Sequence, residues 1–304
     1  MPLGSAFEYI WAIAPHESAP KPSERDYLRS VHHPPGLFVW AYALNLELRN
    51  TGLSPVSISS VWVDHTPQCW YTQRNGAWGK PSCELADLLI VVWDDQNKKA
   101  GRALLVQAKR GKSRSRVAVS QASTKKELHL LGAAPKFLLS GQTSVVSGGS
   151  PKPLNPKVTC EFQLHHYKGS RLRHCTFLQI KDASAKRWPS NVSSWQTMWP
   201  PSSHHETYSE AILGMVAGSA NALGRPFING NMSDDWDRLV TLLINETLAT
   251  TRGTAKGPRQ HTIFHLGSGN IGIGGTGGIQ EGEVPASDDP QGISTVFITP
   301  EKLG

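Results

Sequence analysis

Two short apolar runs joined by a polar connection constrain the fold of this 304-residue chain most strongly. Residues 88–93 read LLIVVW and residues 103–107 read ALLVQ, and each run has the length of one buried strand. The connection at 94–101, DDQNKKAG, is rich in turn-forming residues and ends in glycine. This pattern predicts a β-hairpin with a moderately long connection.

Three polar residues lie at one end of the predicted hairpin. Asp87 opens the first strand, and Gln107 and Lys109 lie two apart on the second strand. Residues two apart on a strand point to the same side of a sheet. An acid, an amide and an amine brought together can hold a divalent cation and orient a water molecule at a phosphate. We therefore expect these three residues to form the functional site.

Asp87 and the tripeptide Gln-Ala-Lys at 107–109 resemble the PD-(D/E)xK, or restriction-endonuclease-like, nuclease superfamily. The resemblance covers roughly residues 40–140 and rests on an acid, a hairpin and a (D/E/Q)-x-K motif in that order. It implies an α/β (α+β) fold, with a mixed central sheet flanked by helices and a C-terminal extension of strands and helices. Two departures stand out: Ala86 replaces the proline, and Gln107 replaces the second carboxylate.

The resemblance also implies a metal-dependent mechanism. Asp87, the side-chain carbonyl of Gln107 and the backbone carbonyl of Ala108 would bind Mg²⁺, with Mn²⁺ as a substitute, because both ions prefer oxygen ligands. Lys109 would orient or deprotonate the attacking water and balance the charge on phosphorus. With Gln107 in place of an acid, the affinity for Mg²⁺ is expected to be modest.

Two glutamates are candidates for the missing carboxylate. Glu84 lies three residues before Asp87. In an extended backbone these two side chains face opposite sides, whereas a turn would let Glu84 join the site. Glu47 lies near the end of a predicted helix at 37–50, and the resemblance implies a further acid on an early helix. The alternative for Glu47 is an ordinary surface glutamate.

Positive charge is concentrated just after these residues. The net charge is +7, and residues 98–126 contain ten lysines and arginines and no acid. Such a run is either a solvated face or a surface for the nucleic-acid backbone, and its position beside the predicted site favours the second. Gln121, near this run, is a candidate to contact nucleic acid, and the alternative is that it is an ordinary surface amide. The candidate nucleic-acid contacts are Lys98, Lys99, Arg102, Arg110, Lys112, Arg114, Arg116, Gln121 and Lys125.

The chain divides into an irregular or capping N-terminal arm (1–36), the nuclease-like core (37–145) and a C-terminal α/β extension (146–304). The extension belongs either to the same compact unit or to an oligomer contact. Helical patterns and caps predict helices, and short apolar runs predict strands. The predicted helices are 37–50, 120–132, 205–224 and 233–250; the predicted strands are 56–64, 136–140 (extending the same sheet) and 294–299; 65–82 is predicted to be a loop.

Other site types fit the sequence less well. Cys160, His165, His166, His174 and Cys175 invite a zinc interpretation, but their spacing matches no standard finger, and strand alternation scatters them. The glycines at 267–278 lack the following helix that a phosphate-binding loop needs. The sequence shows no signal peptide, no run long enough to cross a membrane and no C-x-x-C. We expect a cytoplasmic protein with reduced thiols.

The sequence thus predicts a metal-dependent endonuclease that acts on DNA, with RNA left open, and that has little sequence specificity. Such an enzyme must be restrained in its own cell. The resemblance therefore suggests a bacterial anti-phage or restriction effector that is controlled by homo-oligomerisation or a regulatory partner protein. The alternative is a catalytically inactive nucleic-acid-binding or scaffold protein, which the loss of the second carboxylate to Gln107 favours.

Overall fold

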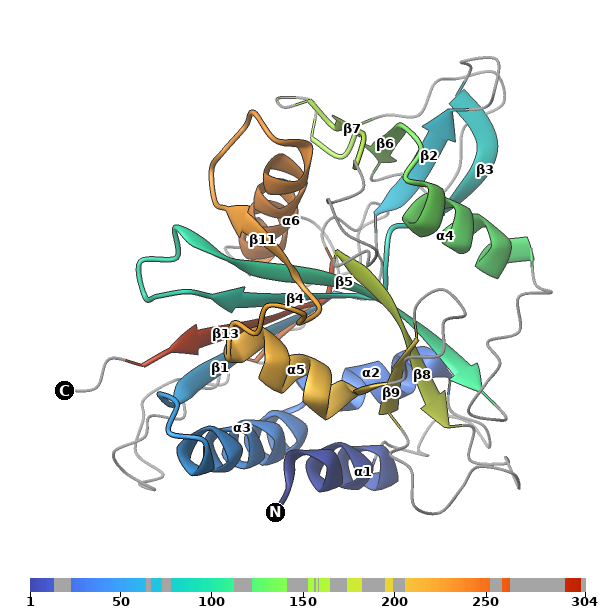
Figure 1. The fold of residues 1–304 in the computed structure, drawn as a ribbon. Coiled ribbons are helices and arrows are strands. Elements are labelled where there is room, and N and C mark those ends of the chain that lie inside the picture. Colours follow the sequence, from blue (N-terminus) through green and yellow to red (C-terminus); the bar gives the residue numbers. More distant parts are fainter. Residues whose placement is uncertain are drawn as a thin grey trace.

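The strands that the structure describes form two sheets, and helices cover both faces of the larger one (Figure 1). The computed structural model describes residues 1–13, 23–63, 67–72, 78–111, 122–140, 153–155, 157, 159–164, 174–181, 195–198, 206–251, 259–262 and 293–301. Within these residues the fold is mixed α/β with a mixed central sheet flanked by helices, which confirms the predicted class at this level.

The helices are α1 (Leu3–Ile13), α2 (Glu24–His32), α3 (Pro34–Asn50), α4 (Ala122–Ala133), α5 (Tyr208–Val216) and α6 (Asp235–Thr251). The strands are β1 (Val56–Val63), β2 (Gln68–Thr72), β3 (Trp78–Glu84), β4 (Leu88–Trp93), β5 (Ala100–Gly111), β6 (Phe137–Ser140), β7 (Glu161–Phe162), β8 (Cys175–Lys181), β9 (Trp195–Met198), β10 (Glu206–Thr207), β11 (Arg225–Ile228), β12 (Arg259–Thr262) and β13 (Thr295–Pro300).

The predicted hairpin lies in the middle of the central sheet. Its strand order is β10-β9-β8-β5-β4-β13-β1-β12, and β11 also pairs with β5. β4 and β5 are antiparallel, with Leu88 opposite Val106, whereas β8 runs parallel to β5 and β13 runs parallel to β4. β8, β9 and β13 come from the predicted C-terminal extension and share this sheet with the predicted core.

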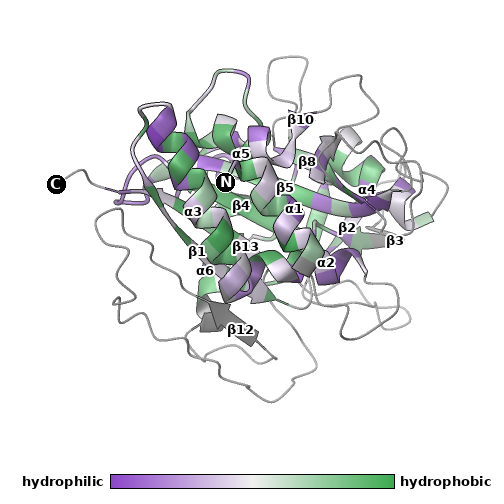
Figure 2. Ribbon diagram, turned by 90° about the horizontal axis from the view of Figure 1, so that it is seen from below, coloured by the Kyte–Doolittle hydropathy of each residue, from purple (hydrophilic) through white to green (hydrophobic). Residues whose placement is uncertain are grey.

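Both faces of the hairpin are covered, which explains its uninterrupted apolar runs. Ile90 and Leu104 point toward the layer of α1, α2, α3 and α5, where Trp40 is fully buried. Leu89 and Leu105 point to the opposite face, which packs against α6. Figure 2 looks through the helical layer onto the apolar strands β4 and β13.

The second sheet corrects two predictions. Its order is β3-β2-β6-β7. The segment 65–82 was predicted to be a loop, yet it contains β2 and most of β3, with Cys69 and Trp70 buried. The predicted strand at 136–140 exists as β6, but it pairs with β2 and β7 rather than extending the central sheet. The parallel neighbour of β5 is β8 instead.

The N-terminal arm was predicted to be irregular or to cap the fold, and its described residues are helical rather than irregular. They form α1 and α2, which cover the central sheet together with α3 (Figure 1). α2 begins with a capping box in which Ser23 and Asp26 bind each other's backbone amides. Tyr27, Leu28 and Val31 of α2 are buried in the helical layer. The abundant prolines and histidines of this arm concealed that apolar spacing.

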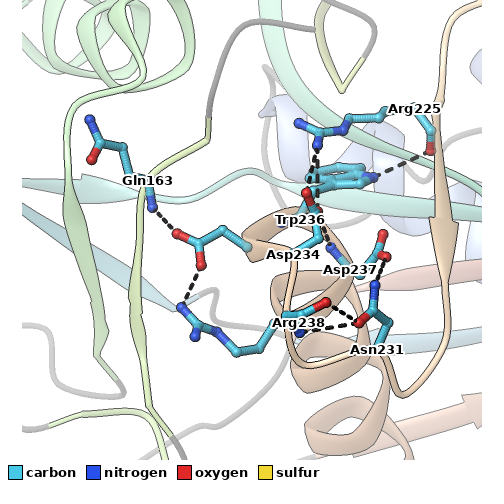
Figure 3. Close-up of polar contacts among 9 residues, drawn as sticks. Gln163, Arg225, Asn231, Asp234, Trp236, Asp237 and Arg238 are labelled. Carbon is cyan, nitrogen blue, oxygen red and sulfur yellow. Dashed lines mark hydrogen bonds and ion pairs between the residues drawn. The ribbon is translucent and has the colours of Figure 1, made fainter.

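Polar contacts at the start of α6 join the two sheets (Figure 3). Oδ1 of Asp234 accepts hydrogen bonds from the amides of Trp236 and Asp237, at 2.9 and 3.1 Å, and so caps the helix. Arg225 of β11 reaches Asp234 at 3.3 Å. Arg238 donates to the first carbonyl of β7 at 2.6 Å. α6 is thereby fixed to an edge of each sheet.

Substituting Gly36 by alanine is expected to destabilise the protein by about 1–3 kcal/mol through overpacking. A Cβ at Gly36 would collide with the backbone carbonyl of Ser30, where α3 leaves α2. Gly4→Ala is the matched control, because its Cβ would meet Ser209 Oγ at an ordinary 3.6 Å. Urea denaturation measures both variants. Equal stability of Gly36→Ala and wild type would contradict the close approach of these two helices.

No helix among the described residues is long and apolar enough to cross a membrane.

Candidate functional site

The hairpin register brings Asp87 and Gln107 together. The amide of Asp87 donates to the carbonyl of Val106 at 2.9 Å, which places Asp87 beside Gln107 on the neighbouring strand. Oδ2 of Asp87 accepts two hydrogen bonds, from Nε2 of Gln107 at 2.5 Å and from the amide of Ala108 at 2.7 Å. Because side chains alternate along a strand, Lys109 points to the same face of the sheet. The structure therefore brings Asp87, Gln107 and Lys109 to one end of the hairpin.

The environment of Asp87 changes its acidity. Burial, the largest cause, and the charge of Glu84 raise the pKa of Asp87, while Lys109, the Ala108 amide and Arg25 lower it; the net result is a rise from 3.8 to about 7. A carboxyl group with this pKa holds a proton for part of the time at neutral pH, because the site lacks enough positive charge to offset its burial. A bound cation would provide that charge.

Lys109 is held by an acid that the sequence analysis did not select. Its Nζ lies 2.9 Å from Oε2 of Glu127, on α4. Both side chains are well shielded, with 17% of Lys109 and 8% of Glu127 exposed. Figure 2 shows β5 changing from apolar to polar where it approaches α4. The ammonium therefore lies between two elements, one from the central sheet and one from the helix that follows.

Glu84, the last residue of β3, lies close enough to the site to act on Asp87 through its charge. Its charge raises the pKa of Asp87, and its Oε1 lies 3.8 Å from the guanidinium of Arg25. Glu24, beside Arg25 on α2, accepts a hydrogen bond from the amide of Arg110 at 3.4 Å. The first turn of α2 thus contacts the site end of β5.

The structure places Glu47 away from the site. Asn45, half a turn earlier on α3, binds the amide and carbonyl of Val56 at 2.7 and 2.9 Å. Val56 pairs with Pro300, the last residue of β13, which runs parallel to β4. Glu47 therefore lies near the far end of β4, roughly 20 Å along the strand from Asp87. The direction of α3 across the sheet, which no local pattern encodes, sets this separation.

The basic run is divided between the two ends of the hairpin. Lys98 and Lys99 are exposed in its connection, and Arg102 lies next to it on β5. Arg110 lies at the site end of β5, and Lys125 is exposed on α4. The second group lies nearer to Asp87 than the first, although strand alternation points Arg110 to the face opposite Lys109. Lys112, Arg114, Arg116 and Gln121 lie outside the described residues.

Two other predicted features can be placed in part. Cys160 contacts Asn155 in the second sheet region, whereas Cys175 of β8 faces the carbonyl of Leu131, so these two thiols belong to different elements. His165, His166 and the glycines at 267–278 lie outside the described residues. Within the described part of the chain, no three metal-ligating acids, histidines or cysteines form a metal-binding group.

The residues that sequence reasoning missed are Glu127, Glu24 and Arg25. A signal existed for each. Ser-Glu-Arg-Asp at 23–26 is a capping-box pattern that predicts the start of α2. Glu127 is the first acid after the basic run and lies on the helix predicted at 120–132. Pairing Glu127 with Lys109, however, required the packing of α4.

Comparison with known proteins adds no assignment. The chain matches no protein-family model, no curated protein and no solved structure.

Proposed function

We propose that this protein is a metal-dependent endonuclease that hydrolyses phosphodiester bonds of DNA with little sequence specificity. The observation that supports this proposal best is the convergence of Asp87, Gln107 and Lys109 on one face at the end of the β4–β5 hairpin. The resemblance described above requires this strand-turn-strand setting. β8 runs parallel to β5 as its neighbour, and α4 lies between these two strands in the sequence; both features agree with a restriction-endonuclease-like core.

The polar atoms of the site fit Mg²⁺ or Mn²⁺. Gln107 uses its Nε2 to bind Asp87, and among the described residues no group hydrogen-bonds its buried Oε1. A buried carbonyl oxygen without a partner is unfavourable, and a cation would satisfy it. Asp87 and Gln107, with the carbonyl of Ala108, would hold the metal ion. When bound, the metal lowers the pKa of water and stabilises the charge that develops on the phosphate.

The protein's own groups would provide the rest of the chemistry. Asp87 must be deprotonated to bind a cation, so binding is favoured above its pKa of about 7. Lys109 places a positive charge at the same end of β5, where it would stabilise negative charge on the phosphate oxygens. The exposed Lys125 of α4 would contact the nucleic-acid backbone rather than bases, which agrees with low specificity. We extend the proposal to control by a regulatory partner or by oligomerisation, in keeping with an anti-phage role.

One observation favours a second candidate, a nucleic-acid-binding scaffold without hydrolysis. In the described part of the chain, Asp87 is the one carboxylate with direct bonds to Gln107 and Ala108, and no three metal-ligating residues cluster there. Such a site would bind Mg²⁺ weakly. The two candidates differ in whether DNA is cut.

Plasmid cleavage separates these candidates. With Mg²⁺ or Mn²⁺ we expect wild-type protein to nick and linearise supercoiled DNA, and EDTA to stop the reaction. Asp87→Ala and Lys109→Ala should each lower the rate by about 100-fold or more. Lys99→Ala is the matched control, because Lys99 is exposed at the other end of the hairpin and should leave the rate unchanged. DNA binding with no cleavage under either metal would favour the scaffold.

A further inference from the structure

We propose that Glu127 is a positioning residue that holds the Lys109 ammonium at the candidate site and supplies the negative charge that Gln107 lacks. This inference rests on the proposed nuclease function. It concerns an acid from α4, outside the hairpin motif, that is joined to Lys109 by the 2.9 Å ion pair.

The ion pair differs from the surface pairs of this protein. Nζ of Lys136 lies 2.7 Å from Oε2 of Glu161, but 50% of the Lys136 side chain and 42% of the Glu161 side chain are exposed. The Lys109 and Glu127 side chains are 17% and 8% exposed. Exposed pairs contribute little because water screens them, whereas removing one partner of a shielded pair leaves an uncompensated charge. The Lys109–Glu127 pair is therefore expected to persist in solution.

α4 is held firmly enough to direct Glu127. Thr124, Leu130 and Leu131 are buried, and the last two pack in the core that α6 and the second sheet share. Glu127 lies one turn from Leu130 and Leu131 on this helix. Its carboxylate is thus fixed by the helix, whereas the four-carbon stem of Lys109 is flexible on its own. The carboxylate of Glu127 therefore restricts the positions that the Lys109 ammonium can take.

The pair leaves Lys109 able to act. An ammonium has three N–H donors, so the ion pair with Glu127 leaves donors for a phosphate oxygen and a water molecule. The pair also sets the charge of the site. With Asp87 and Lys109 alone the formal charge would be zero, and Glu127 makes it −1, which favours a divalent cation. Glu84 adds a further negative charge near Asp87, which Arg25 beside it offsets only in part.

Steady-state cleavage of double-stranded DNA with Mg²⁺ tests the inference. Glu127→Gln should lower kcat about 10- to 100-fold while KM changes little, because a misplaced ammonium affects the transition state more than DNA binding. Glu161→Gln is the matched control, since the same substitution breaks an exposed pair. In a Lys109→Ala background, Glu127→Gln should cause no further loss, because the two residues act as a unit. Additive losses, or an unchanged kcat in Glu127→Gln, would overturn the inference.

A second measurement needs no activity. In wild-type protein labelled with ¹⁵N, the Lys109 ammonium should give a detectable Nζ–H signal, assigned by its loss in Lys109→Arg, because the ion pair slows hydrogen exchange with water. That signal should disappear in Glu127→Gln and remain in Glu161→Gln. Its persistence in Glu127→Gln would refute the positioning role whether or not the protein cuts DNA. An inactive wild type that retains the signal would refute the nuclease proposal and leave the pair established.

Discussion

Asp87→Asn should make the metal-free protein more stable than wild type at pH 8, by up to roughly 4 kcal/mol, and equally stable near pH 4. Burial raises the pKa of Asp87 from 3.8 to about 7, so the folded state holds this proton more tightly than the unfolded state does. The stabilisation from that proton is complete below 3.8 and is lost as the pH rises to about 7. Each unit of difference between the folded and unfolded pKa of Asp87 corresponds to about 1.4 kcal/mol, and the partial exposure of the Asp87 side chain reduces the total.

Urea denaturation between pH 4 and 8 measures this difference. Asp94→Asn is the control, because Asp94 is exposed at the far end of the hairpin and should follow the wild-type profile. Parallel profiles for wild type and Asp87→Asn would contradict a buried, charged Asp87. Millimolar Mg²⁺ should raise the stability of wild type above pH 7 and leave Asp87→Asn unchanged, because only the carboxylate binds the cation strongly.

Gln107→Glu should destabilise the metal-free protein at pH 8 by several kcal/mol and strengthen Mg²⁺ binding about 10-fold or more. Nε2 of Gln107 lies 2.5 Å from Oδ2 of Asp87, where a second carboxylate would bring two negative charges into contact. At pH 5 a shared proton should relieve the repulsion, so the defect should fade on acidification. A bound cation should relieve it in the same way.

Thermal unfolding with increasing Mg²⁺, together with calorimetric titration, measures this effect. The control is Gln107→Met, which keeps the length of the side chain and removes both its donor and its acceptor. It should lose stability at all pH values and gain none from Mg²⁺. If Gln107→Glu bound Mg²⁺ no better than wild type, the metal would not lie between positions 87 and 107.

Local patterns in the sequence predicted the elements better than their arrangement. Residues 88–93 and 103–107 form β4 and part of β5, because strand length, apolar content and a turn-rich connection are all local properties. The hairpin then fixes Asp87 beside Gln107, so this part of the candidate site follows from spacing alone. The helices predicted at 37–50, 120–132 and 233–250 correspond to α3, α4 and α6 for the same reason.

Long-range packing decided the rest. Glu47 lies on the predicted helix but at the wrong end of the sheet, because the direction of α3 is set by its contacts with β1. Trp70 is buried in a segment whose turn-forming neighbours predicted a loop. Lys109 and Glu127 meet only because α4 packs beside the sheets. Each of these depends on surfaces brought together from distant parts of the chain, which propensity and periodicity do not specify.

The place of β13 has a consequence for biosynthesis. This strand separates β1 from β4, yet it is translated roughly 200 residues after them. While the ribosome is still adding those residues, the β4–β5 hairpin has an open edge on the side that β13 later fills. Because chains emerge at about 5–20 residues per second, this interval lasts roughly 10–40 seconds. A nascent chain would therefore acquire its finished central sheet, and the rigid support for Asp87, only when synthesis has passed residue 300.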